Sequence, residues 1–322
     1  MERGFNNNLI ISDGPHIYSN DTIRRRMFFV FIALLPQLLA SITVFGRRAL
    51  LVILLSVVCC IVFELIVDMS RKNIPTMDDF TCVITGMMIA YGLPSNVKLW
   101  IVIVADAVAI IVVKGVIHGK GRNLINPAAT GLLAVYAGLG KFLELWPAPL
   151  VGSSDIPADA AIIPSAYEIM NGAEGVMSTK MELFLGFCPG PLGMVSTVCL
   201  LLGCLFLIWR RVIGWVIPVS VLGTCAFMAL LAGDNIIVTL CSGGTAFMAM
   251  FMATDPVTSP VKRRAQAIYG VMIGLIMMVF RLGTDFIFGG LLAIVVMNLL
   301  GLAIDKFFAF EMYKGLRRKR RT

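Results

Sequence analysis

The chain has 322 residues, of which 58% are hydrophobic and only 14% are charged. Roughly a quarter of the residues of a soluble domain are charged, so this composition excludes an ordinary soluble domain and places the chain in a lipid bilayer. The formal net charge of +8 does not indicate nucleic acid, because cytoplasmic retention of basic loops or contact with anionic lipid explains it. We therefore predict a lipid environment and no nucleic-acid partner.

Apolar windows that can cross the bilayer recur along the chain with short polar breaks. A helix needs about 20 mostly apolar residues to cross roughly 30 Å of hydrocarbon. We predict ten spans: Met27 to Phe45, Ala49 to Val67, Phe80 to Leu93, Leu99 to Ile117, Ala128 to Trp146, Pro191 to Trp209, Val212 to Leu231, Ile236 to Thr254, Ala267 to Arg281 and Phe286 to Phe307. The third and ninth are short, so they are tilted or kinked, or their true ends lie several residues away.

One long extramembrane stretch divides the predicted spans into five before it and five after it. An odd number per half gives the halves opposite topology, as in an inverted repeat with a pathway at its interface. The fold class is thus an all-α polytopic membrane protein of two five-helix inverted repeats. Its divisions are an N-terminal segment 1–26, a first repeat 27–146, an outer loop 147–190, a second repeat 191–308 and a basic tail 309–322.

The distribution of basic residues predicts the orientation. Most of the 27 Lys and Arg residues share one side with the N-terminus, including Arg24 to Arg26, Lys262 to Arg264 and Arg317 to Arg321. Basic loops resist translocation, so both termini are predicted to be cytoplasmic and the loop 147–190 to lie outside. The first 26 residues are polar and predict no secretory signal peptide.

Metal and soluble-cofactor motifs are missing from the sequence. No pair among the eight cysteines has CxxC spacing, so packing is their main predicted role. His16 and His118 have no ligand spacing, and no glycine fingerprint follows a predicted strand. We predict no metal site and no catalytic residue in this chain.

Three positions are candidates for an ion path. Asp106 lies midway along an apolar span, where a charge costs roughly 3 kcal/mol; it either pairs with Lys114 or another basic residue, or binds a transported ion. Asn126 and Asp255, beside Pro127 and Pro256, lie at predicted helix boundaries. Broken helices of this kind hold small cations, but a plain cap and turn explain both motifs equally well.

Motifs spread along nearly the whole chain are similar to those of one family. They are GPHIYS at Gly14 to Ser19, GKGRNLINPAATG at Gly119 to Gly131, SGG at Ser242 to Gly244, FMATDPVTSP at Phe251 to Pro260, YG at Tyr269 before a segment with Arg281, and MN at Met297 followed by Asp305. The chain resembles the D subunit of Rnf ion-translocating electron-transport complexes and the homologous B subunit of the sodium-pumping NADH:quinone reductase. The short N-terminal segment before the first predicted span favours the Rnf D subunit over the quinone-reductase B subunit.

The resemblance implies a covalent FMN in the outer loop. The family's attachment motif is best matched by VMST at Val176 to Thr179, which makes Thr179 the expected phosphoester residue and Ser178 the alternative. Alternatively, both residues merely begin a helix with Glu182 in a capping box. Gly190 and Gly193 follow, either to let a flavin approach the backbone or to let helices pack closely.

The resemblance also implies the wider function. The chain would be one membrane subunit of a bacterial inner-membrane complex that moves electrons between ferredoxin and NAD and transports Na⁺ or H⁺. Other subunits would bind ferredoxin and NAD and hold iron–sulfur centres and further flavins. The quinone-reductase relative suggests riboflavin as a second flavin, without residues to assign to it. The alternative from a different class is a cofactor-free inverted-repeat transporter.

Overall fold

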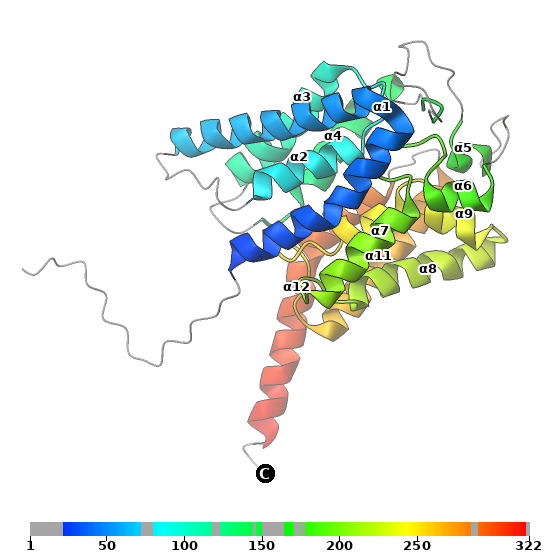
Figure 1. The fold of residues 1–322 in the computed structure, drawn as a ribbon. Helices are drawn as coiled ribbons and strands as arrows, with labels where there is room; N and C mark the ends of the chain where they lie inside the picture. The colour runs from blue at the N-terminus through cyan, green and yellow to red at the C-terminus, as the bar shows by residue number, and fades with distance from the viewer. Residues whose placement is uncertain are drawn as a thin grey trace, which may run out of the picture.

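In the computed structural model of the chain, the described residues are 22–71, 80–117, 123–143, 146–149, 164–170, 175, 178–284 and 289–319. Every regular element within these ranges is helical (Figure 1), which confirms the all-α prediction. The GPHIYS motif, the beginning of GKGRNLINPAATG and part of the predicted outer loop, including Val176, lie outside the described residues.

The first half of the bundle begins with one very long helical element. Gly46 has φ 72° and ψ −158°, a conformation open only to glycine, and it bends the element sharply (Figure 1). The resulting segments agree with the first two predicted spans. The elements of this half are α1 (Ile23–Ser70), α2 (Thr81–Tyr91), α3 (Leu99–Ala107), the π-helix η2 (Val108–Ile117), α4 (Pro127–Leu139) and the short η3 (Gly140–Phe142).

The second half is built from shorter pieces and two long closing helices. Its elements are α5 (Ala166–Met170), α6 (Lys180–Leu185), α7 (Thr197–Trp209), α8 (Val216–Ala232), α9 (Ile236–Cys241), α10 (Thr245–Phe247), the π-helix η4 (Met248–Met252), α11 (Arg263–Gly283) and α12 (Gly289–Lys319). The C-terminal part of α12 projects away from the bundle (Figure 1).

Several predicted spans differ from the observed helices: α8 begins four residues later than predicted, α11 begins four residues earlier, and α12 continues beyond Phe307 to Lys319. The fifth ends at Phe142 rather than Trp146. The sixth begins at Thr197 rather than Pro191, because the preceding segment forms bends and turns against the end of α2, where the Gly193 N–H donates to the Tyr91 carbonyl oxygen at 3.0 Å. The eighth is interrupted after Cys241, because Gly243 and Gly244 have positive φ values that end the helix.

Several helices suit a membrane by length and composition. Among the described residues, four are long and apolar enough to cross one: Ile23–Ser70, Leu99–Val116, Arg263–Gly283 and Gly289–Phe308. Three shorter apolar helices accompany them: Thr81–Tyr91, Thr197–Trp209 and Val216–Ala232. A multi-pass membrane protein is therefore the architecture; the total of ten spans and the inverted repeat stay predictions.

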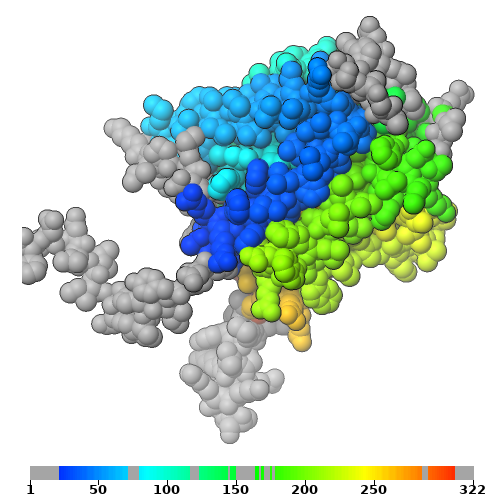
Figure 2. Space-filling view, in the orientation of Figure 1, coloured from blue at the N-terminus to red at the C-terminus, as the bar shows by residue number. Residues whose placement is uncertain are grey.

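The first part of α1 joins the two halves. It packs against α2 on one side and α7 on the other, and its surface lies between those of the two halves (Figure 2). Gly203 of α7 allows the contact: a Cβ there would lie 2.3 Å from the Ala33 carbonyl oxygen and 2.8 Å from the Phe251 ring. Small residues at helix crossings permit this approach inside membranes.

We therefore expect Gly203→Ala to destabilise the protein by about 1–3 kcal/mol, the usual cost of overpacking. The thermal unfolding midpoint in detergent measures this change. Gly223→Ala on α8 is the matched control, since among the described residues nothing beyond its own helix turn lies within 4 Å of its added methyl group. Equal midpoints for the two variants would contradict the close crossing of α1 and α7.

Candidate functional site

A helix break near the middle of the second half is the most irregular part of the bundle. Ser242, Gly243 and Gly244 separate α9 from α10, and the two glycines have φ values of 64° and 71°. Non-helical backbone at membrane depth is tolerated only where protein or a cavity satisfies its polar groups. The break therefore needs hydrogen-bond partners from elsewhere in the chain.

Arg281 of α11 supplies them. Its guanidinium donates to the Ser242 carbonyl oxygen at 3.2 Å, to the Ser242 hydroxyl at 2.7 Å and to the Thr245 hydroxyl at 3.1 Å. The side chain is only 7% exposed. The SGG motif and Arg281 are thus one structural unit, which sequence reasoning missed because their pairing depends on how α11 packs.

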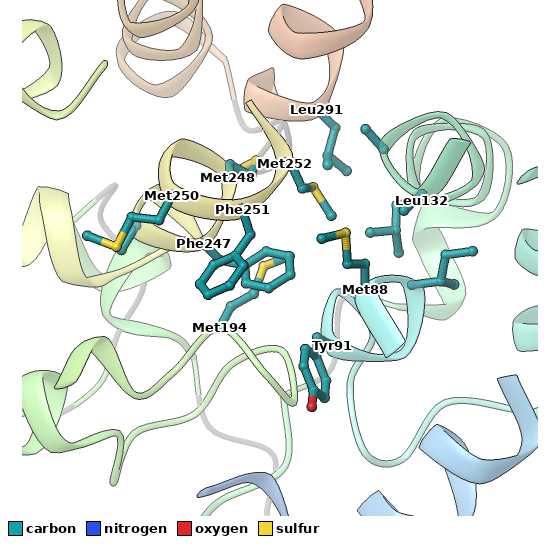
Figure 3. Packing of buried hydrophobic residues seen from close by; sticks show 14 of the residues in the cluster. Met88, Tyr91, Leu132, Met194, Phe247, Met248, Met250, Phe251, Met252 and Leu291 are labelled. Atoms are coloured by element: carbon teal, nitrogen blue, oxygen red, sulfur yellow. The ribbon is translucent and has the colours of Figure 1, made fainter. Parts of the chain in front are cut away.

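The segment after the break meets the first half in a core rich in methionine and aromatic side chains. Figure 3 shows Tyr91 and Met88 of α2 near Phe247 and Phe251 of α10 and η4. The Tyr91 and Phe247 rings meet edge to face with centroids 6.2 Å apart, and Phe247 stacks on Phe251 at 5.6 Å. These contacts fix α2 against the broken helix.

The NPA and ATDP motifs come together at the end of this segment. The Asn126 side chain caps α4 by accepting from the Ala129 N–H at 3.1 Å, and its amide donates to the Met252 carbonyl oxygen at 3.1 Å. Asp255 accepts from the Val257 N–H at 3.2 Å and from the Thr258 hydroxyl at 3.3 Å. The cap and turn are confirmed, and Asn126 also ties the two halves together.

A cavity of about 60 Å³ lies between these motifs, with Asn126, Asp255 and Lys114 in its lining. A water molecule needs roughly 10–15 Å³ of such space, so the cavity has room for a few waters or one hydrated ion. Burial raises the pKa of Asp255, although its hydrogen bonds and the charge of Lys114 oppose this. Two of the three ion-path candidates therefore line one cavity, together with apolar side chains.

Asp106 lies apart from that cavity, and the pairing with Lys114 was wrong. Lys114 instead forms an ion pair with Glu64 at 2.8 Å, because the π-helical turn of η2 carries it beside α1. Asp106 is completely buried, and its Oδ1 accepts from the Ser56 hydroxyl at 2.7 Å and the Cys60 thiol at 3.4 Å. Ser56 and Cys60 were not recognised from the sequence, since small polar residues are common in apolar spans.

The flavin-attachment candidates lie at the start of α6. Thr179 is exposed and Ser178 is half-buried. The Thr179 hydroxyl accepts from the Glu182 N–H at 3.3 Å, and the Glu182 carboxylate accepts from the Thr179 N–H at 2.8 Å, so the capping box is present. A cap accounts for Thr179 locally, yet its hydroxyl remains open to solvent.

Beside Thr179, an apolar groove opens between α6, α7, α8 and α9. It has a volume of about 410 Å³ and an entirely apolar exposed lining. The next residue, Lys180, lies at its edge, followed by Met181 and Phe184. The groove places apolar surface next to the exposed hydroxyl.

The two glycine candidates differ from each other. A Cβ at Gly193 would lie 2.1 Å from the Tyr91 ring, and the Gly193 carbonyl accepts from Gln37 at 2.6 Å. The space beside the Gly193 backbone is therefore filled by side chains of α2 and α1. This favours the packing alternative over ligand binding. Gly190 lines a small pocket with Trp146 and the Ser242 break, so its binding role stays a prediction.

The fold and these motifs define a multi-pass helical membrane protein with a broken-helix centre. The chain matches the NQR2, RnfD, RnfE family over residues 10–314 and belongs to it. It is 36% identical, over 95% of both chains, to the D subunit of the Na(+)-translocating ferredoxin:NAD(+) oxidoreductase complex of Acetobacterium woodii.

Two further relatives have similar names. The chain is 28% identical to the D subunit of the proton-translocating ferredoxin:NAD(+) oxidoreductase complex of Clostridium ljungdahlii, over 92% of this chain and 93% of the relative. It is 33% identical to the D subunit of the ion-translocating oxidoreductase complex of Rhodobacter capsulatus, over 84% of each chain. The resemblance expected from the motifs is confirmed.

The Arg281 unit predicts a difference between two threonines of the broken helix. Thr245→Val removes an acceptor of the buried guanidinium, so we expect a loss of about 1–3 kcal/mol in stability. Thr239→Val is the control, because the buried Thr239 hydroxyl has no hydrogen-bond partner among the described residues; its replacement should be neutral or stabilising. Unfolding midpoints of both variants test this, and an unchanged Thr245→Val would argue against the unit.

Proposed function

We propose that the chain is the D subunit of an Rnf-type ion-translocating ferredoxin:NAD⁺ oxidoreductase complex. The observation that carries the proposal is the similarity to the D subunit of the Acetobacterium woodii complex over 95% of both chains. Both the quinone-reductase and the transporter alternatives are less favoured, since the three relatives described above are all named as D subunits of oxidoreductase complexes.

Within this complex, the chain would carry FMN as a phosphoester on Thr179. FMN, when bound, supplies reversible one- and two-electron chemistry. The residues fit the group: the Thr179 hydroxyl is exposed, Lys180 places a positive charge beside the phosphate position, and the apolar groove next to both suits a flat ring. A covalent tether keeps the local concentration of the cofactor fixed.

The orientation follows the distribution of basic residues. Both termini would be cytoplasmic, and the loop carrying Thr179 would lie on the outer side of the bacterial inner membrane. Ferredoxin and NAD would bind other subunits, some of them with iron–sulfur centres. A riboflavin elsewhere in the protein is part of the proposal, without assigned residues.

The chain would also contribute to the path for Na⁺ or H⁺. Asn126 and Asp255 line a cavity where the two halves meet, and Asp106 is buried in the first half. One relative is named as Na(+)-translocating and another as proton-translocating, so similarity alone does not select the ion.

The attachment residue can be tested without disturbing α6. Thr179→Asn keeps a good helix N-cap but cannot form a phosphoester, whereas Thr179→Ser keeps both. In-gel flavin fluorescence of the denatured chain, expressed with its flavin-attaching enzyme, should vanish in Thr179→Asn and persist in Thr179→Ser and Ser178→Ala. Fluorescence that disappears only in Ser178→Ala would move the attachment to Ser178, and a wild-type chain without fluorescence would refute covalent FMN.

The identity of the complex predicts its partners. Purification through an affinity tag on this chain should bring down a ferredoxin-type iron–sulfur subunit, and the preparation should reduce NAD⁺ with reduced ferredoxin. Mass spectrometry of the copurifying chains provides the readout. Recovery of quinone-reductase subunits with NADH-dependent quinone reduction would instead support the alternative within the family.

A further inference from the structure

The buried carboxyl group of Asp106 has an unusual hydrogen-bond environment. It lies near the end of α3, completely buried, with α1, α2 and α4 packed against that helix. Its Oδ2 has no hydrogen-bond partner, and Asp106 forms no ion pair among the described residues. An isolated carboxylate in hydrocarbon is so costly that such a group normally becomes neutral.

The Ser56 hydroxyl indicates how that neutral state is held. Its oxygen lies 2.7 Å from Asp106 Oδ1 and 2.9 Å from the Gly86 carbonyl oxygen. A serine hydroxyl has one hydrogen to donate and lone pairs with which to accept, so it cannot donate to both acceptors. Both short distances become hydrogen bonds if Asp106 carries a proton and donates it to Ser56, which then donates to Gly86.

The close packing favours a proton over a metal cation at this position. A Cβ at Gly86 would lie 2.8 Å from Val57 Cα, and one at Gly131 would lie 2.6 Å from the Ala105 carbonyl oxygen. Helices thus touch backbone to backbone on two sides of the group. The 2.7 Å between Ser56 and Asp106 is the length of a direct O–H···O bond and leaves no space for an ion between the oxygens.

A polar stripe on α1 leads from Asp106 toward the end of the helix. Residues four apart lie on one helix face, and Ser56, Cys60, Glu64 and Asp68 follow this spacing; Glu64 is half-buried and the other three are buried. Glu64 pairs with Lys114, which lines the cavity shared by Asn126 and Asp255. The stripe therefore runs from the carboxyl group toward the cavity that Lys114 lines.

The local backbone is also irregular at this point. The α-helix α3 gives way to the π-helix η2 directly after Asp106 and Ala107. Segments of π-helix are rare and frequently occur at functional sites. Lys114, which pairs with Glu64 of α1, lies within this π-helix.

We propose that Asp106 is a proton-binding site of the ion path, with the Ser56 hydroxyl as its switch. In the protonated state Asp106 donates to Ser56, and Ser56 donates to the Gly86 carbonyl. In the deprotonated state the Ser56 hydroxyl turns to donate to Asp106 Oδ1, and the Cys60 thiol donates as well. The released proton passes along the stripe to Glu64 or to water in the cavity.

The ionisable groups that face this site are few. On α1 they are Cys59, Cys60 and Glu64; η2 contributes Lys114 and α2 contributes Cys82, and the described face of α4 toward Asp106 is apolar. The neutral carboxyl group follows from the geometry alone, whereas its part in ion transport rests on the proposed function.

Infrared difference spectroscopy of the intact complex tests the protonation. The wild-type complex should show the carbonyl stretching band of a protonated carboxyl group, shifted in D₂O and missing in Asp106→Asn. Glu64→Gln is the matched control and should keep the band, since Glu64 is paired with Lys114. Ser56→Ala should shift the frequency of the band, because it removes the hydrogen-bond partner of the Asp106 carboxyl group. This variant gives a second test if the complex with Asp106→Asn does not assemble.

Three results would overturn the proposal: wild-type and Asp106→Asn spectra that coincide, a band that Glu64→Gln removes, or a band that disappears when Na⁺ is added at constant pH. The last would mean that Na⁺ competes for the site. Transport is then measured in vesicles, where Asp106→Asn should move fewer ions per electron pair than the wild type. Unchanged transport would refute the functional role.

Flavin fluorescence of the same preparations separates the two proposals. An Asp106 band in a chain without fluorescence would leave the proton site intact and refute covalent FMN. Fluorescence in a chain without the Asp106 band would support covalent FMN and refute the proton site.

Discussion

The structure depends on satisfying backbone groups freed by broken helices inside a membrane. Lipid offers no hydrogen bonds, so each free carbonyl or N–H group needs a partner from the protein. Long polar side chains from other segments provide it: the Gln37 amide donates to Gly193, the Tyr136 hydroxyl to Gly92, the Asn126 amide to Met252 and Arg281 to Ser242. Most of these bonds join segments far apart in the chain.

These bonds also determine where polar chemistry is possible. Where Asn126 ties α4 to the end of η4, a cavity remains beside Asp255. Where the Ser56 hydroxyl contacts the Gly86 carbonyl oxygen, it also forms a hydrogen bond with Asp106. Asp106 thus has a neutral hydrogen-bond partner and no opposite charge beside it among the described residues. The same constraint that holds the bundle together therefore produces its two polar regions, one open to the cavity and one enclosed by helices.

The region around Thr179, at the surface of the bundle, is stabilised locally instead. Thr179 and Glu182 form a local capping box that needs no distant partner, so its formation does not depend on tertiary packing. The apolar groove beside Thr179 forms only because α6 lies across α7 and α9. Attachment chemistry and electron transfer would thus occur at the edge of the bundle, apart from the buried ion path.

The sequence by itself determined the membrane environment, the helical class, most helix positions and the family, because apolar windows, caps and linear motifs depend on residues near one another in the chain. It also predicted the Asn126 and Asp255 boundaries and the alternative of a capping box at Thr179. Only the tertiary structure decided that Lys114 pairs with Glu64 rather than Asp106, that Arg281 closes the Ser242 break, and that Gly193 packs on Tyr91. These pairings depend on helix crossings and π-helical turns, which bring together residues whose separation along the chain carries no periodic signal.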